Sequence, residues 1–565
     1  MESSHLARTA AGLALAALLG PLRAPLAAVQ ELEAKLTASD ADVGDKLGEA
    51  CAIAGDTAVV GAALDEDFGV ASGSAYVFER SAGVWAQTAK LTAAARGAPL
   101  AQFGHAVDMD EERIVVGALG EDDGAGAVYV FHRAGSAWPL EQVLQAPDRA
   151  PGDWFGVSVA LDGARLAVGA EQDGDLGPAS GSVYVFERNG APGAPWTRAA
   201  KLHAPSGTAG DRFGVSVALD GERLACGAHA EGGHGAAYVF ERTAGVFGAP
   251  ARLLPSRLAP DGEFGRDVAL EGERLVVGAP RCGTCSGAGA AFVFERVAGA
   301  WTERAALAAE DGHASDRFGH ALALEGERLV VGARWSDRAR TGGGAVYVYR
   351  GCGGDWSLDA ALAPFDLAPF DEFGSSVALA GERILAGSAR DDDDGSFSGS
   401  AYVYSMRLCD TFPFCFGVPG LCPCGNPDAA AGCANSTGAG ALLAVASGTT
   451  SVAADDLVLD VGGLPAGEVA IVYLGGGRDF RPFGDGVRCV RAAATGFQRF
   501  APRLADGAGR VQLGPGIVAE SRGFPRAGRI EACRTYPFQC WYRDPLGPCG
   551  SGFNLSNGLE VFFVP

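Results

Sequence analysis

The sequence predicts an all-β protein: a closed seven-bladed β-propeller of four-stranded antiparallel blades, followed by a smaller, disulfide-stapled β-rich domain. One phrase, approximately Asp-x-Phe-Gly-x-Ser-Val-Ala-Leu-x-Gly-Glu-Arg-Leu-Val-Val-Gly-Ala, then a variable loop and Gly-x-Ala-Tyr-Val-Phe, occurs seven times between Leu47 and Tyr404. Its copies are 51 to 58 residues apart, a period typical of propeller blades, with anchor glycines at Gly48, Gly104, Gly156, Gly214, Gly265, Gly319 and Gly374. Nine of the 14 cysteines lie after Met406, which marks the second domain.

Residues 1–28 are predicted to be a secretory signal peptide. His5 and Arg8 precede an apolar stretch from Ala10 to Leu22, and Leu26-Ala27-Ala28 offers a cleavage point near Ala28. The apolar stretch is too short to span a bilayer, and no later segment is long and apolar enough for a transmembrane helix. We therefore expect a secreted or cell-surface protein that acts as a monomer.

Residues 29–406 are predicted to form the propeller, with four short strands in each repeat. The first two strands are apolar enough to be inner strands, the third alternates as a half-exposed strand does, and the fourth follows near a tryptophan. In the third repeat these segments are Phe155–Leu161, Arg165–Ala170, Gly181–Phe186 and Trp196–Leu202. An acidic-Gly pair such as Asp162-Gly163 joins the first two strands, because glycine supplies the positive φ of a tight hairpin.

The position of the fourth-strand segments predicts how the ring closes. One such segment, Glu31–Leu36, precedes the first repeat, and none follows the seventh. We expect this segment to pair in the seventh blade, which removes the bare sheet edge of an open array. A linear solenoid is the alternative, but it would need capping repeats, and the sequence contains no recognisable cap.

At these residues the chain resembles the FG-GAP repeat family, whose members include the seven-bladed heads of integrin α chains. Phe-Gly occurs in six repeats, Leu47-Gly48 replaces it in the first, and Gly-Ala or Gly-Ser ends every second strand. The resemblance implies calcium in an Asp-x-Asp-x-Asp-Gly loop between strands one and two, but here this loop is only Leu-Asp-Gly-Glu-Arg or similar. Calcium takes about six to eight oxygen ligands, so we do not expect it at these hairpins.

Residues 407–565 are predicted to form a compact, β-sandwich-like domain. Strands are expected at Leu457–Val461, Val469–Tyr473 and Leu559–Val564, with Gly/Pro turns between them. Phrases such as Cys422-Pro-Cys-Gly-Asn and Trp541-Tyr-Arg-Asp-Pro resemble a C-terminal module of large secreted bacterial proteins. This resemblance implies display or retention at the cell surface.

The cysteines of this domain predict disulfides, because a secreted segment this rich in cysteine is usually stapled. They are Cys409, Cys415, Cys422, Cys424, Cys433, Cys489, Cys533, Cys540 and Cys549. Nine is an odd number, so one of them needs a partner elsewhere, and Cys352 in the sixth repeat is available. Zinc at the Cys422–Cys433 cluster is a disfavoured alternative, since no histidine follows His320.

The remaining cysteines lie in the propeller. Cys282 and Cys285 are expected to form a local disulfide rather than a redox pair, because no helix N-terminus is there to lower a thiol pKa. Cys51 and Cys226 replace apolar strand residues, so we expect buried free thiols.

The sequence shows no catalytic motif. It lacks a Gly-x-Ser-x-Gly elbow, a His-Glu-x-x-His zinc motif and a phosphate-binding Gly-x-x-x-x-Gly-Lys loop. The net charge of −23, from 45 basic and 68 acidic residues, argues against nucleic acid as a partner. His105 and His320, which follow Phe-Gly, either face a central channel or occupy ordinary strand positions, and we favour the second interpretation.

The face that carries the loops between strands two and three, together with the interblade connections, is predicted to bind the ligand; we call it the loop face. Its acidic loops belong to the neighbouring blades seven, one, two and three: Asp65–Asp67, Glu121, Asp122, Asp123, Asp173, Asp175, Asp391, Asp392, Asp393 and Asp394. Blades four to six contribute His229, His234, Arg281, Arg334, Trp335, Arg338 and Arg340. The loop face should therefore be negative along one arc and positive along the other, unless these loops are merely solvated.

Two sites follow from this charge pattern. Asp391–Asp394 is the first candidate for a weak calcium site and Glu121–Asp123 the second, because adjacent carboxylates repel unless a cation neutralises them. Alternate residues of an extended segment point the same way, so Asp391 with Asp393, or Asp392 with Asp394, would converge on the ion. Trp335, set among Arg334, Arg338 and Arg340, is the best candidate for a partner anchor, and packing on a neighbouring loop is the alternative.

The predicted function is non-catalytic binding or adhesion to an extracellular protein or glycan, with no certain cofactor. The fold and the missing catalytic motifs favour it. The alternative is an extracellular carbohydrate-active hydrolase in which loop-face carboxylates such as Asp123 or Asp173 act as an acid/base pair. Such a pair would need a deep cleft between the two carboxyl groups.

Overall fold

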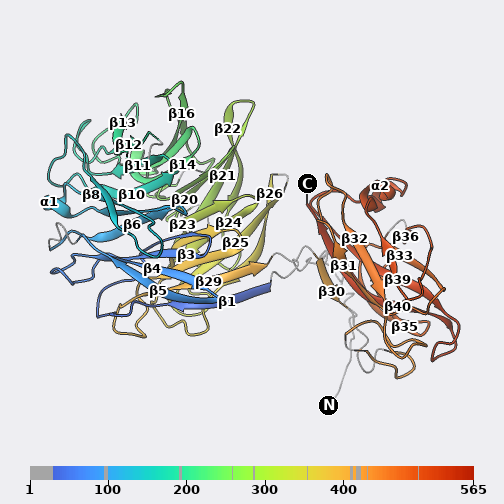
Figure 1. Ribbon diagram of the computed structural model, residues 1–565. Helices are drawn as coiled ribbons and strands as arrows, with labels where there is room; N and C mark the ends of the chain where they lie inside the picture. Colours follow the sequence, from blue (N-terminus) through green and yellow to red (C-terminus); the bar gives the residue numbers. More distant parts are fainter. Residues whose placement is uncertain are drawn as a thin grey trace, which may run out of the picture.

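The computed structural model describes residues 29–564, apart from 94–98, 190–193, 258, 284–286, 353, 408–410, 415–421, 429 and 494–495 (Figure 1). The predicted signal peptide, Cys285, Cys409 and Cys415 lie outside the described residues. Seven antiparallel blades are followed by a further β-rich region, as the sequence predicts. Among the described residues, no helix is long and apolar enough to cross a membrane.

Each blade runs from an innermost first strand to an outermost fourth strand. Blade one contains β2 (Ala50–Ala54), β3 (Thr57–Ala62), β4 (Ser74–Ser81) and β5 (Val84–Leu91); blade two contains β6 (Phe103–Met109), β7 (Arg113–Ala118), β8 (Ala127–His132) and β9 (Leu140–Leu144); blade three contains β10 (Phe155–Asp162), β11 (Arg165–Ala170), β12 (Ser182–Glu187) and β13 (Thr197–Leu202). Blade four contains β14 (Phe213–Asp220), β15 (Arg223–Ala228), β16 (Ala236–Thr243) and a divided outer strand, β17 (Val246–Phe247) with β18 (Ala251–Leu253). Blade five contains β19 (Val268–Glu271), β20 (Arg274–Ala279), β21 (Ala290–Val297) and β22 (Ala300–Leu307); blade six contains β23 (Phe318–Glu325), β24 (Arg328–Ala333), β25 (Ala345–Cys352) and β26 (Asp355–Leu362). Blade seven contains β27 (Phe373–Ala380), β28 (Arg383–Ser388), β29 (Ser400–Arg407) and β1 (Val29–Leu36), and two short turns, α1 (Glu121–Gly124) and η1 (Glu231–Gly233), lie in the loops of blades two and four.

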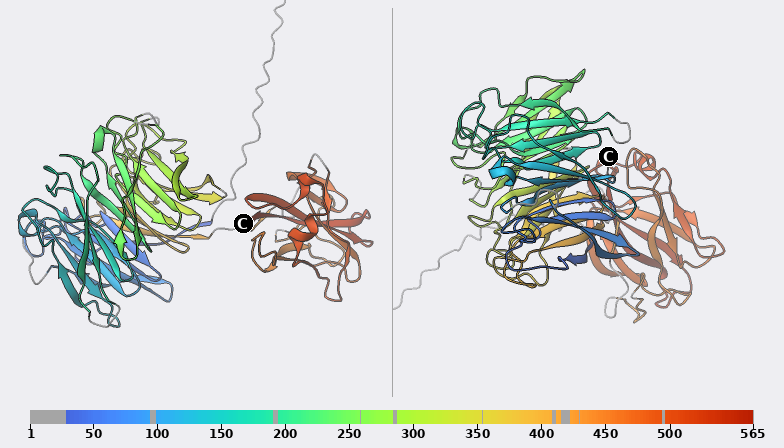
Figure 2. Two further views of the ribbon diagram at one scale, coloured as in Figure 1. Left: turned by 90° about the horizontal axis from the view of Figure 1, so that it is seen from above. Right: turned by 60° about the vertical axis from the view of Figure 1, so that its left-hand side comes forward.

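The first strand of the chain closes the ring. β1 pairs antiparallel with β29, in a register that places Glu31 opposite Ser405 and Leu36 opposite Ala401, which confirms the predicted closure. Figures 1 and 2 show the resulting ring of blades. Because the outer strand of blade seven comes from the opposite end of the propeller sequence, the ring has no unpaired blade edge at its seam.

Two glycines in each repeat let neighbouring blades approach closely at the hub. A Cβ atom on Gly387, at the end of β28, would collide with the carbonyl O of Gly48 in blade one. Gly61 meets Gly104, and Gly332 meets Gly374, in the same way. The Gly-Ala and Phe-Gly motifs are therefore requirements of blade-to-blade packing.

The tight acidic-Gly turns link neighbouring blades on the face opposite the loop face. The Gly221 N–H donates to Asp162 at 2.8 Å, and the Gly381 N–H donates to Glu325 at 2.7 Å. Arg223 in turn donates to the carbonyl O of Gly272 at 2.7 Å. The acidic residues of these turns thus serve as acceptors between blades.

The C-terminal region packs sheets around one core. A six-stranded sheet contains β30 (Thr411–Phe414), β33 (Val469–Leu474), β36 (Gln498–Arg499), β37 (Arg503–Leu504), β39 (Arg534–Asp544) and β40 (Gly552–Phe563). A second sheet contains β31 (Leu442–Ser447), β32 (Val458–Gly462) and β38 (Val511–Leu513), and β34 (Gly477–Phe483) pairs with β35 (Gly486–Arg491). Two short helices, α2 (Ile517–Ser521) and η2 (Arg526–Gly528), complete the region, and Leu459 from one sheet shares a buried cluster with Phe538 from the other.

The disulfides agree with the predicted pairing in most respects. Cys352 at the end of β25 is bonded to Cys533, as the odd number of tail cysteines suggested, and the bond ties blade six to the C-terminal region. Close by, the Arg350 guanidinium lies 5.0 Å from the centroid of the Phe562 ring. Figure 2 shows the C-terminal region at one side of the ring.

Within the C-terminal region the bonds are Cys422–Cys433 and Cys424–Cys549, so these thiols are oxidised rather than arranged around zinc. Cys489 and, in the propeller, Cys282 are also disulfide-bonded.

One cysteine prediction was wrong. Cys540 is a free thiol, because strand alternation points it into the hydrophobic core, where it is fully buried. Burial raises the pKa of Cys540 to about 12, so the thiol is inert. Cys51 and Cys226 are free as predicted, Cys226 buried and Cys51 only partly so.

Candidate functional site

A cavity of about 1150 Å³ occupies the axis of the ring and reaches the loop face. The residue that follows the anchor glycine of every repeat lines it: Glu49, His105, Val157, Val215, Arg266, His320 and Ser375. His105 and His320 therefore face the central channel, and the preference for ordinary strand positions was wrong. The reason is that the first strand of each blade is innermost, so this position points to the axis.

The mouth of the cavity is formed by the residue that precedes the Phe or Leu of each repeat. These residues are Lys46, Gln102, Trp154, Arg212, Glu263, Arg317 and Glu372, and each has a positive φ, between 51° and 63°. A left-handed conformation costs a non-glycine residue on the order of 1 kcal/mol. Because it recurs in all seven blades, the turn before the Phe imposes it, and the propeller presents seven variable side chains around the mouth.

The mouth is positive beside blades five and six. Two smaller cavities of about 340 Å³ and about 180 Å³ adjoin it there. The smaller is lined by Arg266, Arg281, Arg317, Arg334, Glu263 and His320. Glu263 pairs with Arg281 at 2.9 Å and with Arg317 at 3.3 Å.

Two of these four arginines have no ion-pair or hydrogen-bond partner in the described part of the chain. The guanidinium groups of Arg266 and Arg334 form no ion pair or hydrogen bond with a described residue, and the buried Nε of Arg334 is unsatisfied. Both line the two smaller cavities. The unpaired positive charge therefore faces open space at the mouth.

Trp335 stands between the arginines and the next interblade connection. The guanidinium carbons of Arg317 and Arg334 lie 4.7 Å and 5.2 Å from the centroid of its indole. Its Nε1–H donates to Glu372 at 2.9 Å, yet the side chain remains 36% exposed. The indole is thus packed on a neighbouring loop and also offered to solvent.

Burial and like charges shift the pKa values at this side of the mouth. Burial lowers the pKa of Arg334; Glu372 opposes this shift, and Arg266 and Arg317 add to it. Burial, with Arg266 nearby, lowers the pKa of His229 to about 3, and burial takes the pKa of His320 well below its usual range. At neutral pH both imidazoles are therefore uncharged and can donate an N–H.

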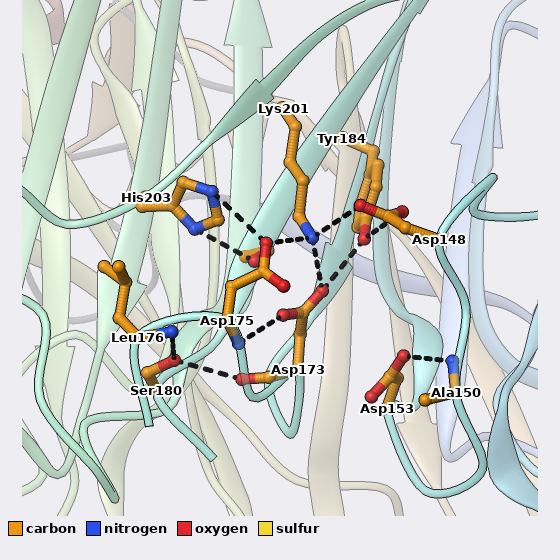
Figure 3. Close-up of polar contacts among 11 residues, drawn as sticks. Asp148, Ala150, Asp153, Asp173, Asp175, Leu176, Ser180, Tyr184, Lys201 and His203 are labelled. Carbon is orange, nitrogen blue, oxygen red and sulfur yellow. Dashed lines mark hydrogen bonds and ion pairs between the residues drawn. The ribbon is translucent and has the colours of Figure 1, made fainter. Parts of the chain in front are cut away.

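Lysine neutralises the acidic arc in blade three (Figure 3). Lys201 Nζ lies 2.9 Å from Asp173, 2.5 Å from Asp175 and 3.0 Å from Asp148. The Tyr184 hydroxyl donates to Asp173 at 2.8 Å, and its ring centroid lies 4.9 Å from the Lys201 Nζ. Burial alone would lower the pKa of Lys201, but its hydrogen bonds outweigh burial and raise it.

Blades one and seven repeat this cluster. In blade one Lys90 lies 2.9 Å from Asp65, 2.5 Å from Asp67 and 2.7 Å from Asp40. In blade seven Lys35 lies 2.8 Å from Asp391, 2.6 Å from Asp393 and 3.2 Å from Asp366. Three of the predicted acidic loops therefore carry an internal ammonium group.

The lysine bears directly on the first calcium candidate. Asp391 and Asp393 converge, as predicted for a cation site, but the cation that they hold is the Lys35 ammonium. A calcium ion would have to displace this group, or to use the exposed Asp392 and Asp394 instead. Calcium at this loop stays a prediction, with a lysine as its competitor.

The second calcium candidate is dispersed. Glu121 is buried and accepts a hydrogen bond from Tyr129 at 2.6 Å. Asp122 is paired with Arg149 at 3.3 Å, and Asp123 lines the central cavity. Because the first two carboxylates have separate protein partners, they do not form a common ligand set with Asp123.

Of the predicted partner-binding residues, the structure brings Arg334, Trp335 and His229 to the arginine-rich side of the mouth. The other three have different contacts: Arg338 pairs with Asp311, Arg340 donates to the Ala339 carbonyl O at 2.9 Å, and His234 Nδ1 lies 2.9 Å from the Gly235 carbonyl O.

Sequence reasoning missed Arg266 and all seven residues that precede the Phe or Leu, of which Glu263, Arg317 and Glu372 lie on the arginine-rich side of the mouth. The available signal was their position beside the Phe-Gly pair, which faces the axis in every blade.

Exposed apolar side chains gather on the loop face. All six exposed aromatic residues of the described propeller lie there: Phe68, Trp154, Trp335, Phe365, Phe370 and Phe397. The opposite face exposes large apolar residues only at the hairpins between strands three and four, where they are Val84, Leu140, Val246 and Val297. The two faces of the ring therefore differ in chemistry.

The model of the FG-GAP repeat family matches the chain seven times, at residues 31–78, 85–131, 138–186, 196–240, 247–294, 301–349 and 356–404. Each match starts near the outer strand of one blade and ends in the third strand of the next, so the first match takes in β1 of blade seven. A search of curated proteins found no match. With more than half of its 565 residues covered by these seven repeats, the chain belongs to the FG-GAP repeat family.

Proposed function

We propose that this protein is an exported, non-catalytic binding or adhesion protein that contacts its ligand with the loop face of the propeller. The observation that carries the proposal is the segregation of all six exposed aromatic side chains of the described propeller to that face. Aromatic residues are enriched at protein interfaces, so their restriction to one face favours that face as the binding surface.

The strongest aromatic group lies beside blades six and seven. Phe365 is 86% exposed and Phe370 is 59% exposed, and both belong to the connection between these blades. Phe397, in the loop between β28 and β29, is 44% exposed, and the Arg390 guanidinium lies 5.4 Å from its ring centroid. Solvent exposure of three phenylalanines in adjoining loops is costly in an isolated protein, so a partner surface is the natural cover.

Export is supported by the disulfides. Cys352–Cys533, Cys422–Cys433 and Cys424–Cys549 require an oxidising compartment to form and persist. The family repeats are consistent with a binding role for the propeller.

The hydrolase alternative receives less support from the geometry. Asp173, one of its two candidate carboxylates, is buried and held by Lys201 and Tyr184, so it is not free to exchange a proton with a substrate. Asp123 does line the central cavity. A hydrolase would therefore need another partner carboxylate for Asp123, and this function stays a prediction.

Arrays of extracellular proteins and glycans test the proposed function. The mature wild-type protein should bind a ligand that Phe365→Ser/Phe370→Ser no longer binds. Val84→Ser/Val246→Ser, on the opposite face, is the matched control and should bind as the wild type does. Equal loss in both double variants, or full retention in the loop-face variant, would overturn the proposal.

A further inference from the structure

We propose that the arginine-rich side of the channel mouth is a binding site for an oxyanion, built from Arg266 and Arg334 with His320. The inference rests on the proposed function and deepens it, because it assigns the loop-face ligand an acidic group, a carboxylate, sulfate or phosphate, that enters the mouth. Arg266 and Arg334 would hold this group by charge-assisted hydrogen bonds.

The first argument is the charge balance. The smaller cavity is lined by four arginines and one glutamate, and its histidine is neutral, so the lining carries a charge of +3. The whole chain has a formal charge of −23, so a positive cavity is not a consequence of composition. Glu263 is already shared by Arg281 and Arg317, which leaves Arg266 and Arg334 without a carboxylate partner among the described residues.

The second argument is that the other nearby carboxylates are either paired with another side chain or too far away to pair with Arg266 and Arg334. Glu372 accepts from Trp335 Nε1 at 2.9 Å and pairs with Arg390 at 3.2 Å. Glu171 pairs with Arg212 at 3.2 Å. Glu49 lines the same cavity as Arg334 but lies beyond ion-pair distance of it. No described carboxylate therefore lies within ion-pair distance of Arg266 or Arg334, and Glu372 and Glu49 act on the pKa of Arg334 only through space.

The third argument is energetic. Cations that are partly desolvated and close to each other destabilise the empty site, since both burial and like charge disfavour the charged forms. The lowered pKa values of Arg317 and Arg334 show this effect on the two guanidinium groups that flank Trp335. A bound anion would reverse this destabilisation, because the anion accepts hydrogen bonds from the guanidinium groups and balances their charge.

The space and the donors suit a small oxyanionic group. The larger of the two cavities measures about 340 Å³, and Arg266, Arg334, His320 and Ser375 in its lining can donate hydrogen bonds. Four cationic side chains line it, those of Lys46, Arg266, Arg334 and Arg390, against the two carboxylates of Glu49 and Glu372, so its lining is also positive. Trp335 also lines it, so its indole is placed to report on the occupant. Arginine favours planar and tetrahedral oxyanions because its N–H groups form a fixed fork.

The test uses the mature full-length protein and three separate probes at constant ionic strength: sulfate, inorganic phosphate and galacturonate. Calorimetry and tryptophan fluorescence should show saturable binding of at least one probe by the wild type. The fluorescence change should disappear in Trp335→Phe while the heat remains. The probe that binds most tightly identifies a sulfate, phosphate or carboxylate ligand.

Arg266→Gln and Arg334→Gln should each weaken binding at least ten-fold, and Arg266→Lys less than that. Arg304→Gln, which removes an arginine paired with Glu295 on the outer strand of blade five, is the control and should bind as the wild type does. Without any probe, Arg266→Gln should melt at or above the wild-type temperature, whereas a structural role for this arginine would lower it.

The site is refuted if no probe binds saturably at tens of millimolar, or if Arg266→Gln/Arg334→Gln binds as tightly as the wild type. Failure here is separable from failure of the proposed function. If the protein binds a ligand on the array but no anion, only the anion site is refuted. If it binds an anion saturably but no array ligand that depends on Phe365 and Phe370, only the loop-face function is refuted.

Discussion

Replacing Lys201 with methionine should destabilise the propeller by about 3 kcal/mol. The change keeps the length of the side chain but leaves the carboxylates of Asp148, Asp173 and Asp175 without their cation. Breaking a buried ion pair by removing one partner costs about 3–5 kcal/mol. The lower value applies, because only the Asp173 side chain is well buried, at 4% exposed, whereas Asp148 and Asp175 are 43% and 48% exposed and remain solvated.

Urea unfolding of the wild type and of Lys201→Met measures this loss. Lys201→Met/Asp173→Asn is the matched control, and it should recover most of the stability because the buried negative charge is gone. Calcium at millimolar concentration should narrow the gap between Lys201→Met and the wild type, since three carboxylates then offer oxygen ligands for a weak site. A loss below about 1 kcal/mol, or a gap that calcium does not change, would refute the view that the ammonium stands where a metal ion could bind.

Three further predictions concern closure, disulfides and pH. Deleting residues 29–36 removes the outer strand of blade seven and should lower the melting temperature sharply; an unchanged value would contradict ring closure by β1. Non-reducing peptide mapping should find a Cys352–Cys533 cross-link and an unmodified Cys540, and a scrambled or reduced Cys352 would count against the tie between the two regions. Burial, with the neighbouring aspartates, raises the pKa of Asp371 to about 6 from 3.8, so the folded state binds this proton more tightly. The stabilising contribution of this proton is full below pH 3.8 and is lost as the pH rises through 6. In Asp371→Asn the free energy of unfolding, measured with urea, should therefore depend less on pH over that range. Retention of the wild-type slope in Asp371→Asn would contradict this assignment.

The fold was accessible from sequence because seven copies repeat the same constraints. The Phe-Gly and Gly-Ala glycines recur since the hub leaves no room for a Cβ, as at Gly48 and Gly387. The segment Glu31–Leu36 predicted how the ring closes, because it was the one fourth-strand segment without a repeat before it, and it pairs in blade seven. In contrast, the free state of Cys540 depends on which face of β39 it occupies, and a count of cysteines carries no information about that.

The lysine clusters could have been predicted from two patterns in the sequence, neither of which is a catalytic motif. Ala-Lys-Leu occurs in the fourth strands of blades seven, one and three, at Lys35, Lys90 and Lys201. The loops of the same three blades share the pattern Asp-x-Asp-x-Gly-x-x-Ser, which begins at Asp391, Asp65 and Asp173. Comparison of the repeats with one another would have paired each lysine with its own loop. The arginines at the mouth show no such internal pattern, because each occupies a position that varies freely between blades.

The fourth-strand position that holds Lys35, Lys90 and Lys201 explains why charge is neutralised on one side of the loop face and not on the other. In blades one, three and seven this position holds lysine, opposite the third-strand tyrosine, and the lysine neutralises the loop. In blades five and six the equivalent residues are Ala306, opposite Phe292, and Ala361, opposite Tyr347. An alanine at this position has no charge that could pair with a loop residue. Blades five and six are also the blades that place Arg266 and Arg334 at the mouth. The internal ammonium groups thus neutralise three of the four acidic loops without any ligand. On the positive arc Glu263 holds Arg281 and Arg317, but Arg266 and Arg334 have no ion-pair partner among the described residues, so a ligand anion is expected at these two arginines.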